Sequence, residues 1–302
     1  MDKTVTTTID YERCIECGEC AAACNERAIS LQDGKPVVSG TECIACGHCM
    51  NVCPVDAVSV DRIDPAALNF STFTLNEKWL PHGDYDVADL ARLMASRRSC
   101  RHYTDRPVSQ EILEDLVRIG ITAPSGSSCQ DWTFTLVPDR TSMLALGHHV
   151  SVFFRKLNKM AEKSYLRALM KLVGKPELDW YYREYYQQVK DGLEGWEHQK
   201  IDRLAHGAVA GIAVGSRPGA STPSEDALLA SGQILLAAHA MGLGTCMIGF
   251  VVSAMQNDRA VKRAAGIPDE ETVHAFIALG YPDERYRNTV YRQRPVVRYY
   301  KA

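Results

Sequence analysis

The chain has 302 residues, which suggests about two domains of ordinary size. Its composition is that of a globular protein, with 46% hydrophobic and 24% charged residues. A formal net charge of −3 gives no electrostatic reason to expect a nucleic-acid partner or an anionic membrane surface. The first residues contain no apolar run, which argues against a secretory signal, so we expect a cytoplasmic protein.

The cysteines are concentrated at the front of the chain. Eight of the eleven lie between Cys14 and Cys53, and they form a repeat with a period of 29 residues. Each copy has the spacing C-x2-C-x2-C-x3-C, and the neighbouring residues repeat as well. A repeat this regular indicates two copies of one supersecondary unit within residues 1–60.

The repeated spacing predicts two [4Fe–4S] clusters. Three cysteines with two residues between each can bind three corners of a cluster. The fourth cysteine of each run then ligates the other cluster. Structural zinc is the alternative, but zinc sites usually use two pairs of cysteines. The predicted ligand sets are Cys14, Cys17, Cys20 and Cys53 for one cluster, and Cys43, Cys46, Cys49 and Cys24 for the other. On these motifs, residues 1–60 resemble a bacterial-type two-cluster ferredoxin, although Asn25 stands where that family usually has proline.

The rest of the chain has the pattern of an α+β domain. Residues 61–83 have no clear period and are predicted to be a linker, followed by a domain over 84–302. Amphipathic helices are expected after Asp84 or Asp86 and after Ser109, which are candidate N-caps. Buried strands are expected at 133–137, 209–214 and 272–279.

Two segments of this domain have an unusual composition. Residues 234–252 carry no acid, lysine or arginine, but His239 and three glycines favour a buried helix ending near Gly242, then a turn and a strand, over a membrane span. Residues 151–205 are rich in charged and aromatic side chains. They are interpreted as helices that cover the core, or alternatively as a lid over a substrate pocket.

The clusters imply an electron acceptor within the chain. A flavin is the expected acceptor, because it takes electrons singly and passes them on in pairs. No dinucleotide-binding or P-loop motif is present, so basic side chains must bind the flavin phosphate. Arg97, Arg98, Ser99 and Arg101 are candidates, although a basic stretch of this kind is by itself more typical of a solvated surface.

Four segments in a fixed order extend this interpretation. SRRSCRHY, APSGSSCQDW, GLGTCMIGF and a basic tail follow one another along the chain. This order resembles the FMN-dependent nitroreductase family over residues 85–302, and its ferredoxin-fused members over the whole chain. The resemblance implies two [4Fe–4S] clusters and FMN as cofactors, with FMN at the interface of a homodimer.

The resemblance also implies roles for particular residues. Arg97, Ser99 and Arg101 match the element that contacts the FMN phosphate, ribityl chain and ring edge. The remaining implied contacts are Pro124 and Ser125 from the partner subunit, the backbone of Met247, Ile248 and Gly249, and Arg292 or Arg294 at the phosphate. Ser128 stands where the family usually has asparagine, and Ile248 stands where some members have glutamate.

The expected function is an FMN-dependent oxidoreductase. It would take single electrons from the clusters and reduce a small planar acceptor such as a nitroaromatic, a quinone or an activated alkene. Two alternatives remain: a flavin-dependent reductive dehalogenase or ene-reductase of one dedicated metabolite, and a non-enzymatic electron-transfer module. A redox protein is a candidate electron donor, and oxygen-sensitive clusters indicate an anaerobic cytoplasm. No catalytic acid or base is identified.

Overall fold

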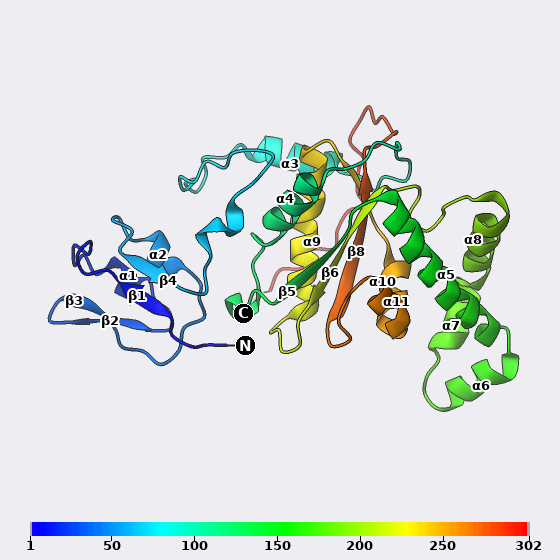
Figure 1. Ribbon diagram of the computed structural model, residues 1–302, viewed down its shortest axis with the longest axis horizontal. Coiled ribbons are helices and arrows are strands. Elements are labelled where there is room, and N and C mark those ends of the chain that lie inside the picture. The colour runs from blue at the N-terminus through cyan, green and yellow to red at the C-terminus, as the bar shows by residue number, and fades with distance from the viewer. Residues whose placement is uncertain (1, 301–302) are drawn as a thin grey trace.

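The N-terminal part of the computed structural model, which describes residues 2–300, is built from two similar halves (Figure 1). Two short helices, α1 (Glu19–Ala22) and α2 (His48–Asn51), each follow a glycine with a left-handed backbone. Two antiparallel pairs join the halves: β1 with β4, and β2 with β3. The strands are β1 (Thr7–Ile9), β2 (Ile29–Gln32), β3 (Lys35–Val38) and β4 (Val58–Val60).

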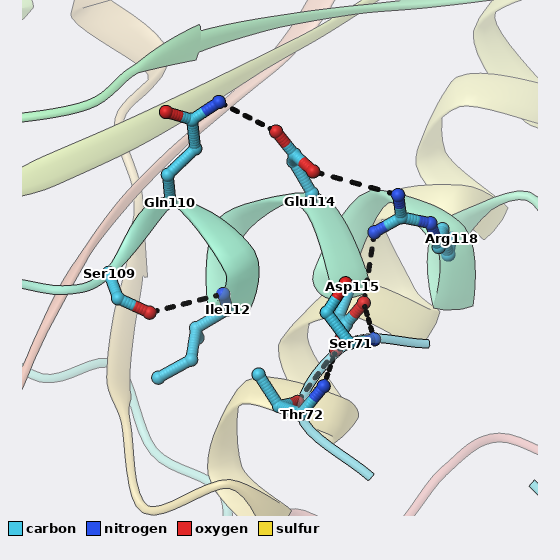
Figure 2. Close-up of polar contacts among 8 residues, drawn as sticks. All are labelled: Ser71, Thr72, Ser109, Gln110, Ile112, Glu114, Asp115 and Arg118. Atoms are coloured by element: carbon cyan, nitrogen blue, oxygen red, sulfur yellow. Dashed lines mark hydrogen bonds and ion pairs between the residues drawn. The ribbon is translucent and has the colours of Figure 1, made fainter. Parts of the chain in front are cut away.

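The segment that follows is bound to the body of the molecule. It contains one short 3-10 helix, η1 (Pro65–Leu68), and then runs without regular structure to α3 (Val87–Ser96). Ser71 and Thr72 donate hydrogen bonds to the carboxylate of Asp115, a fully buried residue of α4 (Gln110–Gly120) (Figure 2). The predicted linker is therefore an ordered connection that packs on α4.

The two helices predicted after the linker are confirmed. Asp86 caps α3 by accepting from the backbone N–H groups of Ala88 and Asp89. Ser109 caps α4 by accepting from the N–H of Ile112 (Figure 2). Short polar side chains at these positions satisfy backbone donors that have no partner within the helix.

A four-stranded antiparallel sheet forms the centre of the body. The order of strands is β5 (Trp132–Val137), β6 (Ala210–Ser216), β8 (Thr272–Gly280) and β7 (Gly244–Met247). The three strands predicted from the sequence are confirmed as β5, β6 and β8. Every residue of β6 is buried, because this central strand is covered on both faces.

Helices cover both faces of the sheet. On one face, α4 and α9 (Pro223–Ala240) pack against Ile212, Val214 and Ile277. On the other face, α5 (Arg140–Ala161) and α10 (Gly249–Asn257) pack against Ala213, Phe276 and Ala278. A short helix, α11 (Arg259–Ala264), lies beside α10. This alternation of side chains along the strands produces the predicted α+β architecture with two cores.

The chain between β5 and β6 runs outward from the sheet along α5 to three further helices (Figure 1). These are α6 (Ser164–Leu172), α7 (Glu177–Glu184) and α8 (Tyr186–Gln199). The helical segment predicted at 151–205 therefore begins earlier, at Arg140. It lies on the side of the sheet opposite to the N-terminal part.

The uncharged stretch at 234–252 folds largely as predicted. It contains the end of α9, a turn at Gly242 with a φ of 81°, and β7. The prediction missed the start of α10 at Gly249. Among the described residues, no helix is long and apolar enough to cross a membrane.

Candidate functional site

The eight N-terminal cysteines surround two small hollows. Cys24 lies with Cys43, Cys46 and Cys49 at one hollow. Cys53 lies with Cys14, Cys17 and Cys20 at the other. The structure thus brings each fourth cysteine to the run of the opposite half, as the predicted ligand sets require. No group of three or more His, Cys, Asp or Glu among residues 2–300 is placed to bind a single metal ion.

Backbone N–H groups point at the cysteine sulfurs in matching pairs. Ala28 N donates to Cys24 Sγ at 3.2 Å, and Ala57 N donates to Cys53 Sγ at 3.1 Å. Glu16 N and Ala45 N approach the first cysteine of each run, both at 3.4 Å. Donors of this kind stabilise negatively charged sulfur, so the donor set fits thiolates that bind iron.

The chemistry of the thiols also fits a cluster. Burial raises the pKa of Cys49 to about 11, with further contributions from the neighbouring Cys24 and Cys46. Four thiolates so close together therefore need the positive charge of iron to remain deprotonated. His48 Nδ1 lies 3.1 Å from Cys46 Sγ, which makes it a neighbour of a predicted ligand.

The arginine segment 97–101 is extended and runs beside β7. Ser99 forms a parallel bridge with Thr245, and Cys100 N donates to Thr245 O at 2.9 Å. Burial raises the pKa of the Cys246 thiol above its ordinary value. Arg101, Arg97 and Ser99 lie near this thiol and lower its pKa in part. Alternate side chains of an extended segment point to the same side, so this backbone is compatible with the predicted grouping of the three residues.

A hollow of about 380 Å³ opens beside this segment. Arg97 and Arg98 line it together with Gly244 and Thr245 of β7. Further lining residues that the sequence did not indicate are Arg92, His239, Glu284, Tyr286 and Arg287. The hollow is basic overall, and guanidinium groups bind phosphate through paired donors.

Glu284 is the acidic residue among those that line this hollow. Its carboxylate accepts from the backbone N–H of Arg101 at 3.2 Å and from the hydroxyl of Tyr286. Burial raises the pKa of Glu284, but these hydrogen bonds outweigh it and leave the pKa below its ordinary value. Glu284 therefore stays ionised and ties the segment that follows β8 to the arginine segment.

The loop before α10 leads into the first turn of that helix, where backbone N–H groups have no partner within the helix. Ile248 N donates to Phe276 O at 2.9 Å, so this N–H is used within the chain. Gly249 is the first residue of α10, where a backbone N–H has no partner within the helix. Met247 is 42% exposed beside it, so Gly249 and Met247 remain as the accessible part of the predicted loop.

Pro124 and Ser125 lie far from the arginines of the same chain. Gly126, which follows them, donates to Asp226 in the first turn of α9, whereas His239 in the last turn of α9 lines the arginine hollow. Thirteen residues separate Asp226 from His239, which corresponds to about 20 Å along the helix. The two groups also lie at opposite edges of the sheet, β5 and β7, or about 14 Å apart across three strand spacings.

The C-terminal basic residues are not brought to the arginine hollow either. Arg292 and Arg294 lie in the exposed segment after β8, and Arg292 Nη1 donates to the nearby Val290 O. Arg287, from the same segment, lines the hollow instead. A basic residue in this part of the sequence was expected, but its position could not be fixed because the segment has no regular structure.

A second cavity, of about 260 Å³, lies between α5, α8 and the loop before β6. Its wall is mainly apolar and includes Phe154, Trp196 and Phe250. Asp202 orders the loop by accepting from Leu204 N and Ala205 N and by pairing with Arg140 at 2.8 Å. This cavity could not be predicted from the sequence, because its residues are spread over several elements.

His206 lies between this cavity and the arginine segment. It lines the cavity and has a left-handed backbone with a φ of 57°. Burial lowers its pKa, and the positive charge of Arg101 lowers it further, so the imidazole is neutral near pH 7. Phe250, beside Gly249, also lines the cavity.

Comparisons with known proteins agree with this fold. Residues 94–281 match the nitroreductase family, and residues 7–60 match the 4Fe-4S dicluster domain. An NADH dehydrogenase from Thermus thermophilus is 25% identical over 199 residues, which cover 66% of this chain and 89% of that protein. Iodotyrosine deiodinase 1 from Rattus norvegicus is 24% identical over 196 residues, which cover 63% and 61%. A crystal structure of a nitroreductase with bound FMN from Bacteroides fragilis covers 69% of this chain and 97% of that one, with a TM-score of 0.51 and 18% identity.

The fold and the N-terminal cysteine repeat thus define an iron–sulfur oxidoreductase of the α+β class. The chain belongs to the nitroreductase family and carries a 4Fe–4S dicluster domain in front of the family domain. The predicted family and the two predicted [4Fe–4S] clusters are therefore confirmed. The non-enzymatic alternative is not retained, because the nitroreductase family match and the NADH dehydrogenase relative indicate an oxidoreductase.

Proposed function

We propose that the protein uses FMN to reduce a small planar acceptor, with electrons delivered one at a time by two [4Fe–4S] clusters. Bound FMN would accept single electrons and release them in pairs. The side chains of Arg97 and Arg101 would bind and orient it, and the Gly249 N–H would donate to its ring. The basic composition of the arginine segment and its position beside β7 support this assignment.

The observation that carries the proposal is the division of the predicted FMN contacts between two distant places in one chain. Arg97, Ser99 and Arg101 lie at the β7 edge, whereas Pro124 and Ser125 lie at the β5 edge. A second copy of the chain would bring the two groups together, so we propose a homodimer with two composite sites. The exposed apolar residues of the C-terminal segment, among them Tyr291, Val296 and Tyr300, support burial against such a partner.

The acceptor is assigned to the cavity between α5 and α8. Its aromatic wall suits a flat ring. Two of its lining residues, His206 and Phe250, lie near Arg101 and Gly249, which are assigned to FMN. Arg203 and the neutral His206 provide polar contacts for a nitro, carbonyl or phenol oxygen. The helices α5 to α8 would thus shape the substrate site, in agreement with the lid alternative for residues 151–205.

The electron donor is assigned to a small redox protein. Cys17 and Cys46 are the exposed members of their runs, and Ile15 beside Cys17 is 60% exposed. An exposed apolar residue next to a predicted cluster suits brief contact with another electron carrier.

Reductive removal of a halogen from an aromatic ring is a second candidate reaction. The iodotyrosine deiodinase from rat aligns with 63% of this chain, and the cavity offers Arg203 for an acidic group on such a substrate. Both reactions would use the same cofactors, so the acceptor alone separates them.

One experiment tests the main proposal. The iron-loaded protein is titrated with FMN, sized in solution, and reduced stepwise without oxygen while the visible spectrum is recorded. We expect two FMN per dimer, loss of both the iron–sulfur and flavin bands, and recovery of the flavin band when a nitroaromatic is added. A monomer, or a protein that binds no FMN, would refute the proposal, and faster recovery with an iodophenol would favour dehalogenation.

A further inference from the structure

The N-terminal part contacts the body at the loop that contains Pro124 and Ser125. Ser128 Oγ donates to Ala45 O at 3.4 Å. Ala45 lies between Cys43 and Cys46, in the run predicted to hold one of the clusters. It is 3% exposed and has a left-handed backbone, with a φ of 51°.

The loop on the other side of this contact is firmly held. The buried carboxylate of Asp226 accepts from Gly126 N at 2.9 Å and from Thr222 Oγ1 at 2.7 Å. The thiol of Cys129 donates to the same carboxylate. Ser127 and Ser128 also have left-handed backbones, which makes this turn a fixed surface for the cluster run.

A second attachment fixes the same arrangement from the linker. Asp115 accepts from Ser71 N, Thr72 N and Thr72 Oγ1 at 2.7 to 3.0 Å, and it pairs with Arg118 at 2.9 Å (Figure 2). The helix η1 also packs against α4. These contacts hold the N-terminal part on the β5 side of the sheet, away from α5 to α8 (Figure 1).

This placement has a consequence for the route of the electrons. The run that holds Cys43 and Cys46 lies beside the chain's own Pro124–Ser128 loop, whereas the chain's own arginines lie about 20 Å further along α9 and at the other edge of the sheet. In the proposed dimer, that loop completes the site formed by the partner's arginines. Electron transfer slows steeply with distance, so the partner's site is the closer one.

We infer that the clusters of one chain reduce the flavin bound by the arginines of the other chain, through the contact between Ala45 and Ser128. This inference rests on the proposed function. Two reduced clusters would each lose one electron, from the [4Fe–4S] 1+ to the 2+ state, and the flavin would gain two electrons and two protons from water. A low-potential one-electron donor, such as dithionite, returns the clusters to the reduced state.

Mixed dimers test the inference directly. One chain carries R97A and R101A, so that only the other chain's arginines bind FMN. In the first dimer, the chain with intact arginines carries C46S and the other chain keeps its clusters. In the second dimer, R97A, R101A and C46S are all on one chain, and the other chain is unchanged.

We expect different flavin reduction in the two dimers, although each binds one FMN. In the first, dithionite should bleach the flavin within about twofold of the rate of the unmodified dimer. In the second, bleaching should fall at least tenfold, to the background set by a dimer of two C46S chains. The fluorescence lifetime of oxidised FMN gives a readout without electron transfer, and it should be shorter in the first dimer because a cluster lies close to the flavin.

The outcomes separate this inference from the proposed function. Equal rates and lifetimes in the two dimers, or faster bleaching in the second, would overturn the inference while leaving FMN binding intact. An unmodified dimer that binds no FMN would overturn the proposed function and the inference with it. If C46S chains do not fold, C24S removes a ligand of the same cluster from the other half of the repeat and replaces C46S in both dimers.

Discussion

The N-terminal part and the body of this chain are stabilised by different means. Residues 2–63 have a small buried core, whose members are Cys20, Ile29, Ala45, Cys49, Val58 and Val60. The body buries a four-stranded sheet between two helical layers and has two larger cores. The first region therefore depends on iron ligation for its stability, whereas the second depends on apolar burial. One chain thus combines a metal-dependent fold with a metal-independent one. The two are joined by a clamp, in which Ser71 and Thr72 of the linker bind Asp115 of α4.

Removal of iron should have the strongest effect, because it tests directly whether only the N-terminal part depends on the metal for its stability. We expect the N-terminal part to lose its fixed structure completely, because its core is too small to support it, while the body keeps its helices and sheet. Limited proteolysis should then cut within residues 2–60 and leave a stable fragment that contains residues 84–300. Iron-loaded protein is the control, and an unchanged cleavage pattern after iron removal would contradict the prediction.

Loss of the FMN arginines should give the next largest effect. Arg101→Ala should weaken FMN binding about ten- to one-hundredfold, because one charge-assisted hydrogen bond contributes about 1.5–3 kcal/mol. Arg97→Ala should have a similar effect, and the thermal unfolding of either variant should change little. Quenching of flavin fluorescence measures the affinity.

Arg106→Ala is the matched control for these two variants. Arg106 is a nearby arginine that stacks on the ring of Tyr281, 3.8 Å from its centre. It is assigned no role in FMN binding, so this variant should bind FMN as the unmodified protein does. Equal weakening in all three variants would show that the loss of positive charge, and not the position, sets the affinity.

The two regions also differ in how far the sequence alone could describe them. The cysteine spacing predicted both ligand sets, because ligands and repeat lie within 60 residues and the chemistry restricts the spacing. Ser109 and Asp86 likewise identified helix starts from local hydrogen bonding. Local rules of this kind can be read from one sequence.

Features that depend on distant contacts could not be predicted in this way. Glu284 reaches Arg101 across 183 positions, and Ser128 reaches Ala45 across 83. The cavity combines residues of α5, α8 and the segments before β6 and after β7, and no period in the sequence relates them. The position of Asp115 under the linker also depends on packing, although a helical aspartate among apolar neighbours is a signal that could have drawn attention to it.

The clamp at Asp115 should give an intermediate effect and tests how the regions are joined. Asp115→Ala should destabilise the body by about 1–2 kcal/mol, because it removes the acceptor of the linker donors and one of the two carboxylate partners of Arg118. Proteolysis should then become faster within residues 61–83. Asp115→Asn keeps the shape of the side chain and is the control, with a smaller loss expected in chemical unfolding.

The same clamp should depend on pH. Burial raises the pKa of Asp115, but the hydrogen bonds from Thr72 and Ser71 outweigh it, so the folded pKa lies below the ordinary carboxyl value. The contribution is therefore complete above that ordinary value and is lost as the pH falls through the folded pKa. Cleavage of the linker should accelerate in this acidic range in the unmodified protein but not further in Asp115→Ala. Equal pH dependence in both proteins would exclude Asp115 as the cause.

Gly147→Ala should have the weakest effect, and it changes the body without changing the N-terminal part. Gly147 lies inside α5 and lines the cavity, and a new Cβ would meet Leu204 at 3.9 Å, an ordinary contact distance. Alanine in place of a glycine within a helix stabilises by about 0.5–1 kcal/mol, so the melting temperature of the body should rise by about 1–4 °C. Gly232→Ala in α9 is the matched control, because its Cβ meets nothing within 4 Å and it does not line the cavity. Both variants should stabilise the body equally and leave iron-dependent unfolding of residues 2–63 unchanged. Only Gly147→Ala should raise the KM for the acceptor, because the new methyl group takes space in the cavity. The rise should be about fourfold, since the contact of one methyl group corresponds to about 0.8 kcal/mol. A KM that is the same in both variants would place the acceptor outside this cavity.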